Sequence, residues 1–172
     1  MLTMGVAIAI PEPFGSELRQ QRAAFGDPMA ETVPSHVTLM PPTEVTDAEF
    51  DGVCGALQSA ASSMHPFPMR LRGTGTFRPI SPVVFIAVSQ GISYTELLAK
   101  VVRTKLEAPE PEFPFHPHVT IAHNLDDDAL DRAYDELAAF ECTFQVDAFH
   151  LYLHEGENGW APRHEFMLGP DV

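Results

Sequence analysis

One four-residue pattern occurs twice in this chain, and it limits the folds that the chain can adopt. HVTL begins at His36, and HVTI begins 82 positions later, at His118. A chain of this composition contains a bare His-x-Thr triplet about 0.5 times by chance, whereas the matched pair with its Val and following aliphatic residue is expected well under about 0.01 times. The pair therefore indicates an internal repeat, with equivalent elements around each motif.

The segments around the two motifs follow one order in both halves of the sequence, judged from apolar runs, alternation and helical spacing. The first half gives a strand at 5–11, a helix from Ser16, the motif strand, a helix from Thr46 and a strand at 66–73. The second gives a strand at 82–89, a helix from Ser93, the motif strand, a helix from Asp126 and one long strand from Thr143 to Glu155, with a last strand near 163–169. The sequence predicts an α+β fold in one domain, 1–172, built from two related lobes (approximate repeats 1–80 and 81–172) with a cleft between them.

Three of the expected helices carry side chains that can cap their N-termini. Thr46 with Glu49, and Ser93 with Glu96, have the spacing of a capping box, in which each side chain bonds the other residue's backbone N–H. Asp126 opens a run of three aspartates where the helix dipole favours negative charge. We therefore expect these acids to stabilise a helix and not to bind a cation.

Each motif presents an imidazole and a hydroxyl on one face of a strand, because residues i and i+2 point the same way. His36 shares its face with Thr38, and His118 with Thr120. Near neutral pH, one neutral imidazole can accept a proton while one imidazolium donates, and the hydroxyls can donate to an anionic oxygen. The set predicts in-line displacement at phosphorus without a metal; which histidine is the base is left open.

The charge balance restricts the partners. The chain has 24 acidic and 10 basic side chains and a net charge of -14, which opposes a large footprint on duplex DNA or RNA. Two cysteines are too few for a disulfide framework, and neither a signal peptide nor an apolar segment long enough to span a membrane is evident. We expect a cytoplasmic monomer with no membrane or duplex DNA partner.

The paired motifs resemble those of the 2H phosphoesterase superfamily, which includes the RNA 2',3'-cyclic phosphodiesterase and 2'-5' RNA ligase-like proteins. The resemblance also covers PSHVTLMPP, FPFHPHVTIAH and LRGTGTFRPISPVVFIAV, and so nearly the whole chain. It implies a bilobal, pseudo-two-fold fold with antiparallel sheets lining a central cleft and helices outside. It implies that His36, Thr38, His118 and Thr120 are catalytic, without cofactor or metal, on the cyclic phosphate of a small nucleotide or an RNA terminus.

Four further residues are candidates for substrate binding. Arg78 follows Phe77 in a stretch that the resemblance places near the cleft, so Arg78 could contact phosphate and Phe77 could stack on a base or pack in the core. His116 shares a strand face with His118, and Tyr152 lies on an alternating polar face that is either cleft or solvent. On the strand that begins at His118, alternation predicts that His123 points away from the face shared by His118 and Thr120.

Two other functions fit the same residues. The cleft could hold a nucleotide or phosphorylated metabolite without turnover. Alternatively, His116 and His118, with His36 near them, could bind zinc in a metal hydrolase, since imidazole is a common zinc ligand.

Overall fold

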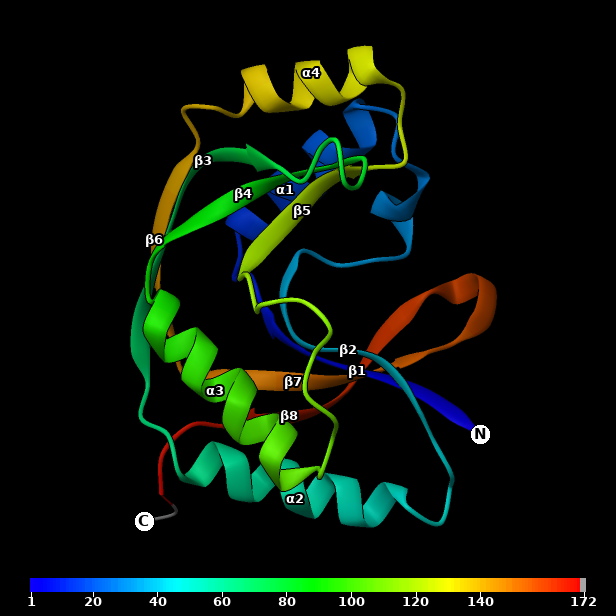
Figure 1. The fold of residues 1–172 in the computed structure, drawn as a ribbon, viewed down its shortest axis with the longest axis vertical. Coiled ribbons are helices and arrows are strands. Elements are labelled where there is room, and N and C mark those ends of the chain that lie inside the picture. Colours follow the sequence, from blue (N-terminus) through cyan, green and yellow to red (C-terminus); the bar gives the residue numbers. More distant parts are fainter. Residues whose placement is uncertain (171–172) are drawn as a thin grey trace.

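The computed structural model describes residues 1–170, and the order of its helices and strands follows the sequence prediction up to β6 (Figure 1). The strands are β1 Leu2–Ala9, β2 His36–Val45, β3 Phe67–Thr76, β4 Val83–Gln90, β5 His118–His123, β6 Glu141–Val146, β7 Ala148–His154 and β8 Trp160–Met167. The helices are α1 Phe14–Ala24, α2 Phe50–Ser62, α3 Ile92–Lys105 and α4 Asp127–Glu136, with two short 3₁₀ helices, η1 Pro28–Glu31 and η2 Gly156–Asn158.

The strands form two antiparallel four-stranded sheets, in the orders β2-β1-β7-β8 and β5-β4-β3-β6. We call these sheet A and sheet B. The two orders correspond, with β1 and β4 at equivalent inner positions and the motif strands β2 and β5 at equivalent edges. The α+β, pseudo-two-fold fold with antiparallel sheets is thus confirmed. Each sheet takes strands from both halves of the sequence, since β3 joins sheet B whereas β7 and β8 return to sheet A.

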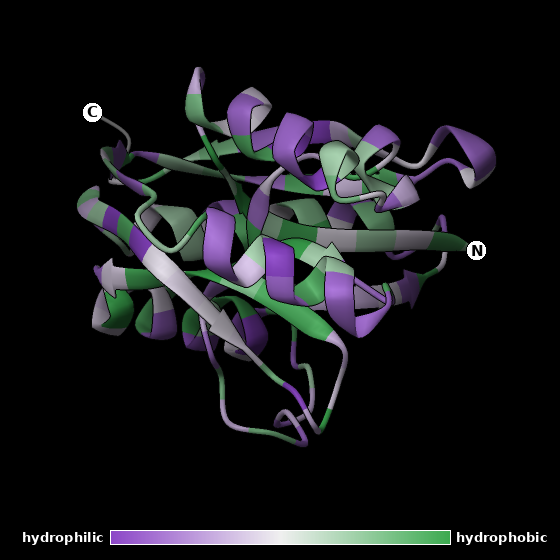
Figure 2. Cartoon of the chain, turned by 90° about the horizontal axis from the view of Figure 1, so that it is seen from above, coloured by the Kyte–Doolittle hydropathy of each residue, from purple (hydrophilic) through white to green (hydrophobic). Residues whose placement is uncertain are grey.

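The helices cover the outer faces of the sheets. Helices α2 and α3 pack against each other and against strands of sheet A, and α1 and α4 pack against strands of sheet B. In Figure 1, α4 lies along the top of the molecule and α2 along the bottom. Helix α2 buries Leu57, Ala60 and Ala61 completely, and each buried Leu is worth about 1.5–3 kcal/mol. Figure 2 shows hydrophilic and hydrophobic residues alternating around the helices. None of the helices within residues 1–170 is long and apolar enough to cross a membrane.

Helix starts agree only partly with the capping signals. Thr46 and Glu49 form the reciprocal capping box, through Thr46 N to Glu49 Oε2 at 3.0 Å and Glu49 N to Thr46 Oγ1 at 3.2 Å. The Asp126 carboxylate caps α4 by accepting from the Ala129 N–H. The starts at Ser16, Thr46 and Ser93 are wrong. Helix α1 begins at Phe14, and α2 begins at Phe50 although the Thr46–Glu49 box forms ahead of it. Helix α3 follows Gly91, whose φ of 93° suits glycine.

The single long strand expected from Thr143 is also wrong. It is two strands, β6 and β7, which break at Asp147 and lie in different sheets. The buried residues change from even to odd numbers at the break, since Val146 and Phe149 are both buried although they are three positions apart. A strand of period two cannot bury both on one face, so the chain turns there from one sheet to the other.

Candidate active site

The two motif strands run side by side at the meeting edges of the two sheets. Strand β2 is the edge of sheet A, β5 is the edge of sheet B, and the two contact each other. Each motif histidine is the first residue of its strand, and the aliphatic residues behind it, Val37 and Val119, are fully buried. The apolar half of each motif thus anchors the strand in the core, while the polar half faces the space between the sheets.

Both motifs end in the same irregularity. On β2, Thr38 pairs with Ala7 and Met40 pairs with Val6, so Leu39 is an extra residue. On β5, Thr120 pairs with Phe85 and Ala122 with Val84, so Ile121 is extra. Such bulges bend a strand and redirect the side chains after it. The repeat therefore extends to backbone detail, and the two histidine–threonine pairs lie in equivalent geometries.

The two imidazoles are oriented by the same backbone contact. His36 Nδ1 lies 2.7 Å from the Pro34 carbonyl oxygen, and His118 Nδ1 lies 2.6 Å from that of His116. Because a carbonyl only accepts, each Nδ1 carries the proton and donates it. In the neutral ring, Nε2 is then an acceptor. Each histidine thus has one nitrogen fixed to its own strand and one available for proton transfer.

Burial favours the neutral form of both rings. Desolvation is the main cause that lowers the pKa of His36; the nearby Arg22 cation lowers it further, and the bond to Pro34 acts in the opposite sense. Desolvation likewise lowers the pKa of His118, with smaller contributions in the same direction from His116 and His36, against the bond to the His116 carbonyl. The resting site therefore holds two neutral imidazoles at neutral pH.

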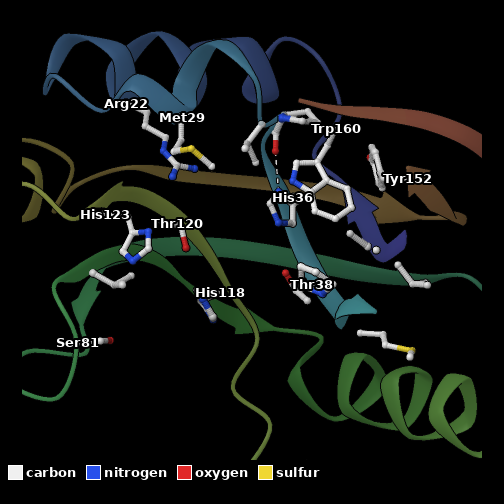
Figure 3. A pocket seen from close by; sticks show the side chains of 18 of the residues that line it. Arg22, Met29, His36, Thr38, Ser81, His118, Thr120, His123, Tyr152 and Trp160 are labelled. Atoms are coloured by element: carbon white, nitrogen blue, oxygen red, sulfur yellow. Dashed lines mark hydrogen bonds between the residues drawn. The ribbon is translucent and has the colours of Figure 1, made fainter. Parts of the chain in front are cut away.

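A cavity of about 510 Å³ lies between the sheets, and residues of both motifs line it (Figure 3). Six of the eight residues proposed from sequence line it: His36, Thr38, Phe77, His118, Thr120 and Tyr152. Tyr152, on β7, is buried, and burial raises the pKa of its hydroxyl to about 12. The phenol therefore stays protonated near neutral pH and can donate a hydrogen bond into the cavity.

His116 and Arg78 do not line this cavity. The His116 ring is exposed and belongs to an aromatic cluster, with ring centroids 5.3 Å from Phe77 and 5.1 Å from Phe85. Arg78 Nη1 bonds Asp131 Oδ1 at 2.9 Å and lies 3.7 Å from Asp127 Oδ1, both on α4. Arg78 thus pairs with carboxylates outside the cavity. The His116 ring lies next to that of His118, with 5.8 Å between the ring centroids.

The aromatic cluster holds the His118 ring in place. Phe77 meets His118 edge-to-face at 5.0 Å, and Phe85 lies 5.2 Å from it. Gly75 makes this possible, because a Cβ there would stand 2.6 Å from the Phe85 ring. The ring of Phe77 is thus packed against His118 and is also part of the cavity wall.

The polar and aromatic cavity residues that were not predicted from the sequence include Arg22, Ser81, His123 and Trp160. Trp160 begins β8, and its ring lies over Gly5, where a Cβ would approach it to 3.3 Å. Alternation places His123 on the opposite face, and this is wrong: the bulge at Ile121 shifts the phase, so Ile121 and Ala122 are both buried and His123 turns to the cavity. A bulge leaves no mark in the hydrophobic pattern of a six-residue strand.

The metal alternative has no ligand set. Among residues 1–170, no group of three or more His, Cys, Asp or Glu side chains is placed to hold a metal ion. In particular, His116 and His118 do not join His36 in such a group.

Two related sheets that bring a pair of histidines to one cavity define the class of two-histidine phosphoesterases. Residues 10–158 match the family model of the 2'-5' RNA ligase superfamily. The protein named "Putative phosphoesterase" from Bacillus pumilus is 32% identical over 148 residues, which cover 84% of this chain and 85% of that protein. The chain therefore belongs to the 2'-5' RNA ligase superfamily, and its family-level function is that of a phosphoesterase or 2'-5' RNA ligase.

Solved structures share the fold at lower sequence identity. The structure of TT0787 of Thermus thermophilus has a TM-score of 0.73 at 21% identity, over 100% of both chains. That of E. coli LigT complexed with NADP+ has a TM-score of 0.70 at 22% identity, over 97% of this chain and 98% of LigT. These likenesses support the two-sheet, pseudo-two-fold architecture.

Proposed function

We propose that the protein is a metal-independent phosphodiesterase that opens the 2',3'-cyclic phosphate of a small nucleotide or an RNA end by two-histidine acid–base catalysis. One observation carries the proposal: His36 and His118 have the same backbone-fixed tautomer and line one cavity from equivalent strands. Thr38 and Thr120 accompany them in that cavity. Two matched proton-transfer groups on either side of a phosphate are what in-line displacement requires.

The proposed reaction is hydrolysis, with water as the only co-reactant. A water oxygen forms a bond to phosphorus while the bond from phosphorus to one ribose oxygen breaks. One neutral imidazole takes a proton from the water through Nε2, and the opposite imidazolium gives a proton to the departing ribose oxygen. The product is a phosphomonoester with a free hydroxyl. Thr38 and Thr120 donate hydrogen bonds to the non-bridging oxygens, whose charge rises in the transition state.

Substrate binding favours uptake from solvent of the proton that the resting site lacks. Both imidazoles are neutral when the cavity is empty, because burial lowers both pKa values. A phosphodiester anion between them favours the charged form of a neighbouring imidazole and so raises its pKa. Ligand and proton therefore bind together, and the site becomes competent for acid catalysis only with an anion in place.

Relatives support a nucleotide-sized ligand. The solved LigT structures include complexes with 3'-AMP, ATP, NADP+ and phosphate. A cavity of about 510 Å³ lies within the range of small-molecule sites. The net charge of -14 opposes a long duplex footprint, so we infer a mononucleotide or a single-stranded terminus as the partner.

The test is hydrolysis in EDTA of nucleoside 2',3'-cyclic phosphates and of RNA oligomers ending in a cyclic phosphate. His36→Ala and His118→Ala should each lower kcat by at least about 100-fold, the usual contribution of an acid or base. His65→Ala, which changes an exposed histidine outside the cavity, is the matched control and should keep full activity. Undiminished turnover in either cavity variant would refute the proposal. Tight nucleotide binding without turnover would instead favour the binding-module alternative.

A further inference from the structure

Arg22 is a buried cation in the cavity wall that the reaction above does not use. Its side chain is 9% exposed, and its Nε donates to Asp27 Oδ2 at 2.8 Å. A guanidinium has five N–H donors, and within residues 1–170 no other hydrogen bond or ion pair from this one is present. Figure 3 shows its end directed into the cavity, toward Thr120. Four donors of a fixed, charged group are therefore without a protein partner, and the group that carries them lines the space where a ligand would lie.

The Arg22 guanidinium is held in position by three elements. The Asp27 carboxylate, which is fully buried, accepts from Arg22 on α1, from the Met29 N–H in η1 at 2.9 Å and from the His123 N–H at the end of β5 at 3.0 Å. His123 is three residues past Thr120, about 10 Å along a strand. The carboxylate that fixes Arg22 is thus anchored beyond the motif on β5, whereas the guanidinium points back toward Thr120 and is near enough to His36 to lower its pKa. The Arg22 donors are therefore preorganised next to the paired motifs.

The cavity is chemically asymmetric although its catalytic pairs are equivalent. Arg22, His123 and Ser81 line one end, and Trp160 and Tyr152 line the other (Figure 3). A ligand whose two ends were chemically alike would not match both ends of this cavity. The polar end suits an anion, and the aromatic end suits an apolar or planar group.

The charges of the cavity are unlike those of the rest of the molecule. The chain carries a net charge of -14, yet no Asp or Glu within residues 1–170 lines the cavity, and Arg22 is its one Lys or Arg. The overall field therefore disfavours each added negative charge on a ligand. A gain in affinity from an extra phosphate would have to come from a local site.

We propose that Arg22, with His123 and Ser81, binds a second phosphate of the substrate, so that the enzyme prefers 2',3'-cyclic nucleotides that also carry a phosphate on the 5' oxygen. The inference rests on the proposed function, because the first phosphate is the one between His36 and His118. The 5' oxygen is the other phosphate-bearing position of a ribonucleotide. The forked guanidinium can contact such a phosphate through two parallel hydrogen bonds.

The experiment has a binding arm and a turnover arm. In the binding arm, calorimetry compares the Kd of a nucleoside 3'-phosphate with that of the 3',5'-bisphosphate. Neither ligand has a cyclic phosphate that the enzyme could hydrolyse. Kinetics compares a nucleoside 2',3'-cyclic phosphate with its 5'-phosphorylated form and with a dinucleotide that ends in a cyclic phosphate. In the wild type, the extra phosphate should improve Kd and kcat/KM by at least about tenfold, the usual effect of charge-assisted hydrogen bonds. If kcat/KM rises more for the 5'-phosphorylated nucleotide, the subsite binds a free 5'-phosphate. If it rises more for the dinucleotide, the subsite binds an RNA backbone phosphate.

The decisive variant is the double substitution R22Q/D27N, which removes the cation without leaving a buried carboxylate unpaired. It should abolish the preference for the extra phosphate, as measured by the ratio between paired ligands. R72Q, which removes an exposed arginine outside the cavity, should keep the preference. If the double variant does not fold, R22K keeps the charge opposite Asp27 but loses the fork, and it should lower the preference several-fold.

The two proposals fail in different ways. Hydrolysis of cyclic phosphates with no gain from a 5'-phosphate overturns the second subsite and leaves the proposed function standing. Arg22-dependent binding of the bisphosphate without any turnover overturns the proposed function and supports the subsite. An equal loss on both ligands of a pair in R22Q/D27N overturns the subsite, because Arg22 would then serve the reacting phosphate itself.

Discussion

His36 and His118 are held in the same tautomer by the same contact, a hydrogen bond from Nδ1 to the carbonyl oxygen two residues earlier in the chain. That bond is local to each motif, so the contact that fixes the tautomer is supplied by the motif segment itself. A proline stands at one of the two carbonyls and directly after the other, at Pro34 and Pro117. Proline restricts its own φ and the conformation of the residue before it, which helps fix both carbonyls.

The pH profile should separate the free enzyme from the substrate complex. Both imidazoles have a pKa below 6.5 in the empty site, so the fraction with one protonated and one neutral ring falls as the pH rises above 6.5. The profile of kcat/KM reports the free enzyme, and the profile of kcat reports the complex, in which the bound anion raises one pKa. We expect kcat/KM to reach its maximum below pH 6.5 and the alkaline limb of kcat to lie at higher pH. Steady-state kinetics across a pH range of about 4.5 to 9, which brackets the ordinary histidine pKa, tests this, and coincident alkaline limbs would contradict it.

Stability should also depend on the two histidines. A histidine with a lower pKa in the folded than in the unfolded state binds fewer protons when folded, so its neutral form is compatible with the fold and its protonation favours unfolding. Stability is therefore full above pH 6.5 and is lost as the pH falls from 6.5 toward the lowered pKa values. Urea midpoints measured about one pH unit above and one below the ordinary histidine pKa should differ less in the double variant H36Q/H118Q than in the wild type. An unchanged difference would show that burial does not perturb these rings.

Gly75 should matter for activity through the ring that it supports. A Cβ at this position would stand 2.6 Å from the Phe85 ring, which itself packs against His118. Gly75→Ala therefore forces the Phe85 ring to move, which disturbs the packing around His118, and it should cost about 1–3 kcal/mol of stability, as overpacking does, with a further loss of kcat. Denaturant unfolding and kinetics on the same preparations measure both effects.

Gly55→Ala is the matched control for that substitution. Gly55 lies inside α2, and a Cβ there would meet nothing within 4 Å. This variant should gain about 0.5–1 kcal/mol from helix propensity and keep its kcat. A loss of kcat in both variants would point to a general effect of added methyl groups and against a specific role for Gly75.

The site could be predicted from sequence where its chemistry is local and repeated. Alternation along a strand predicts that each histidine shares a face with its threonine, and the repeat predicts that the two pairs occupy equivalent places beside one cleft. All four residues line one cavity. Arg22 could not be predicted because its partner, Asp27, is itself tied to the backbone N–H of His123, 96 residues further on, a contact that only the packing of α1 on sheet B creates. The break at Asp147 was missed for a related reason: each side alternates correctly, and only the phase between them changes.

The buried ion pair of Arg22 and Asp27 should be far more important for stability than the exposed pair of Arg70 and Glu141. Asp27 is fully buried and accepts three hydrogen bonds, so Asp27→Ala leaves an unpaired buried cation and two unpaired backbone N–H groups. Breaking a buried pair costs about 3–5 kcal/mol. Glu141 is 46% exposed in its side chain, so Glu141→Ala should cost about 0–1 kcal/mol. Chemical denaturation of the two variants measures the difference. Similar losses in both would mean that solvent reaches Asp27, and that the Arg22 guanidinium is not held rigidly at the cavity wall.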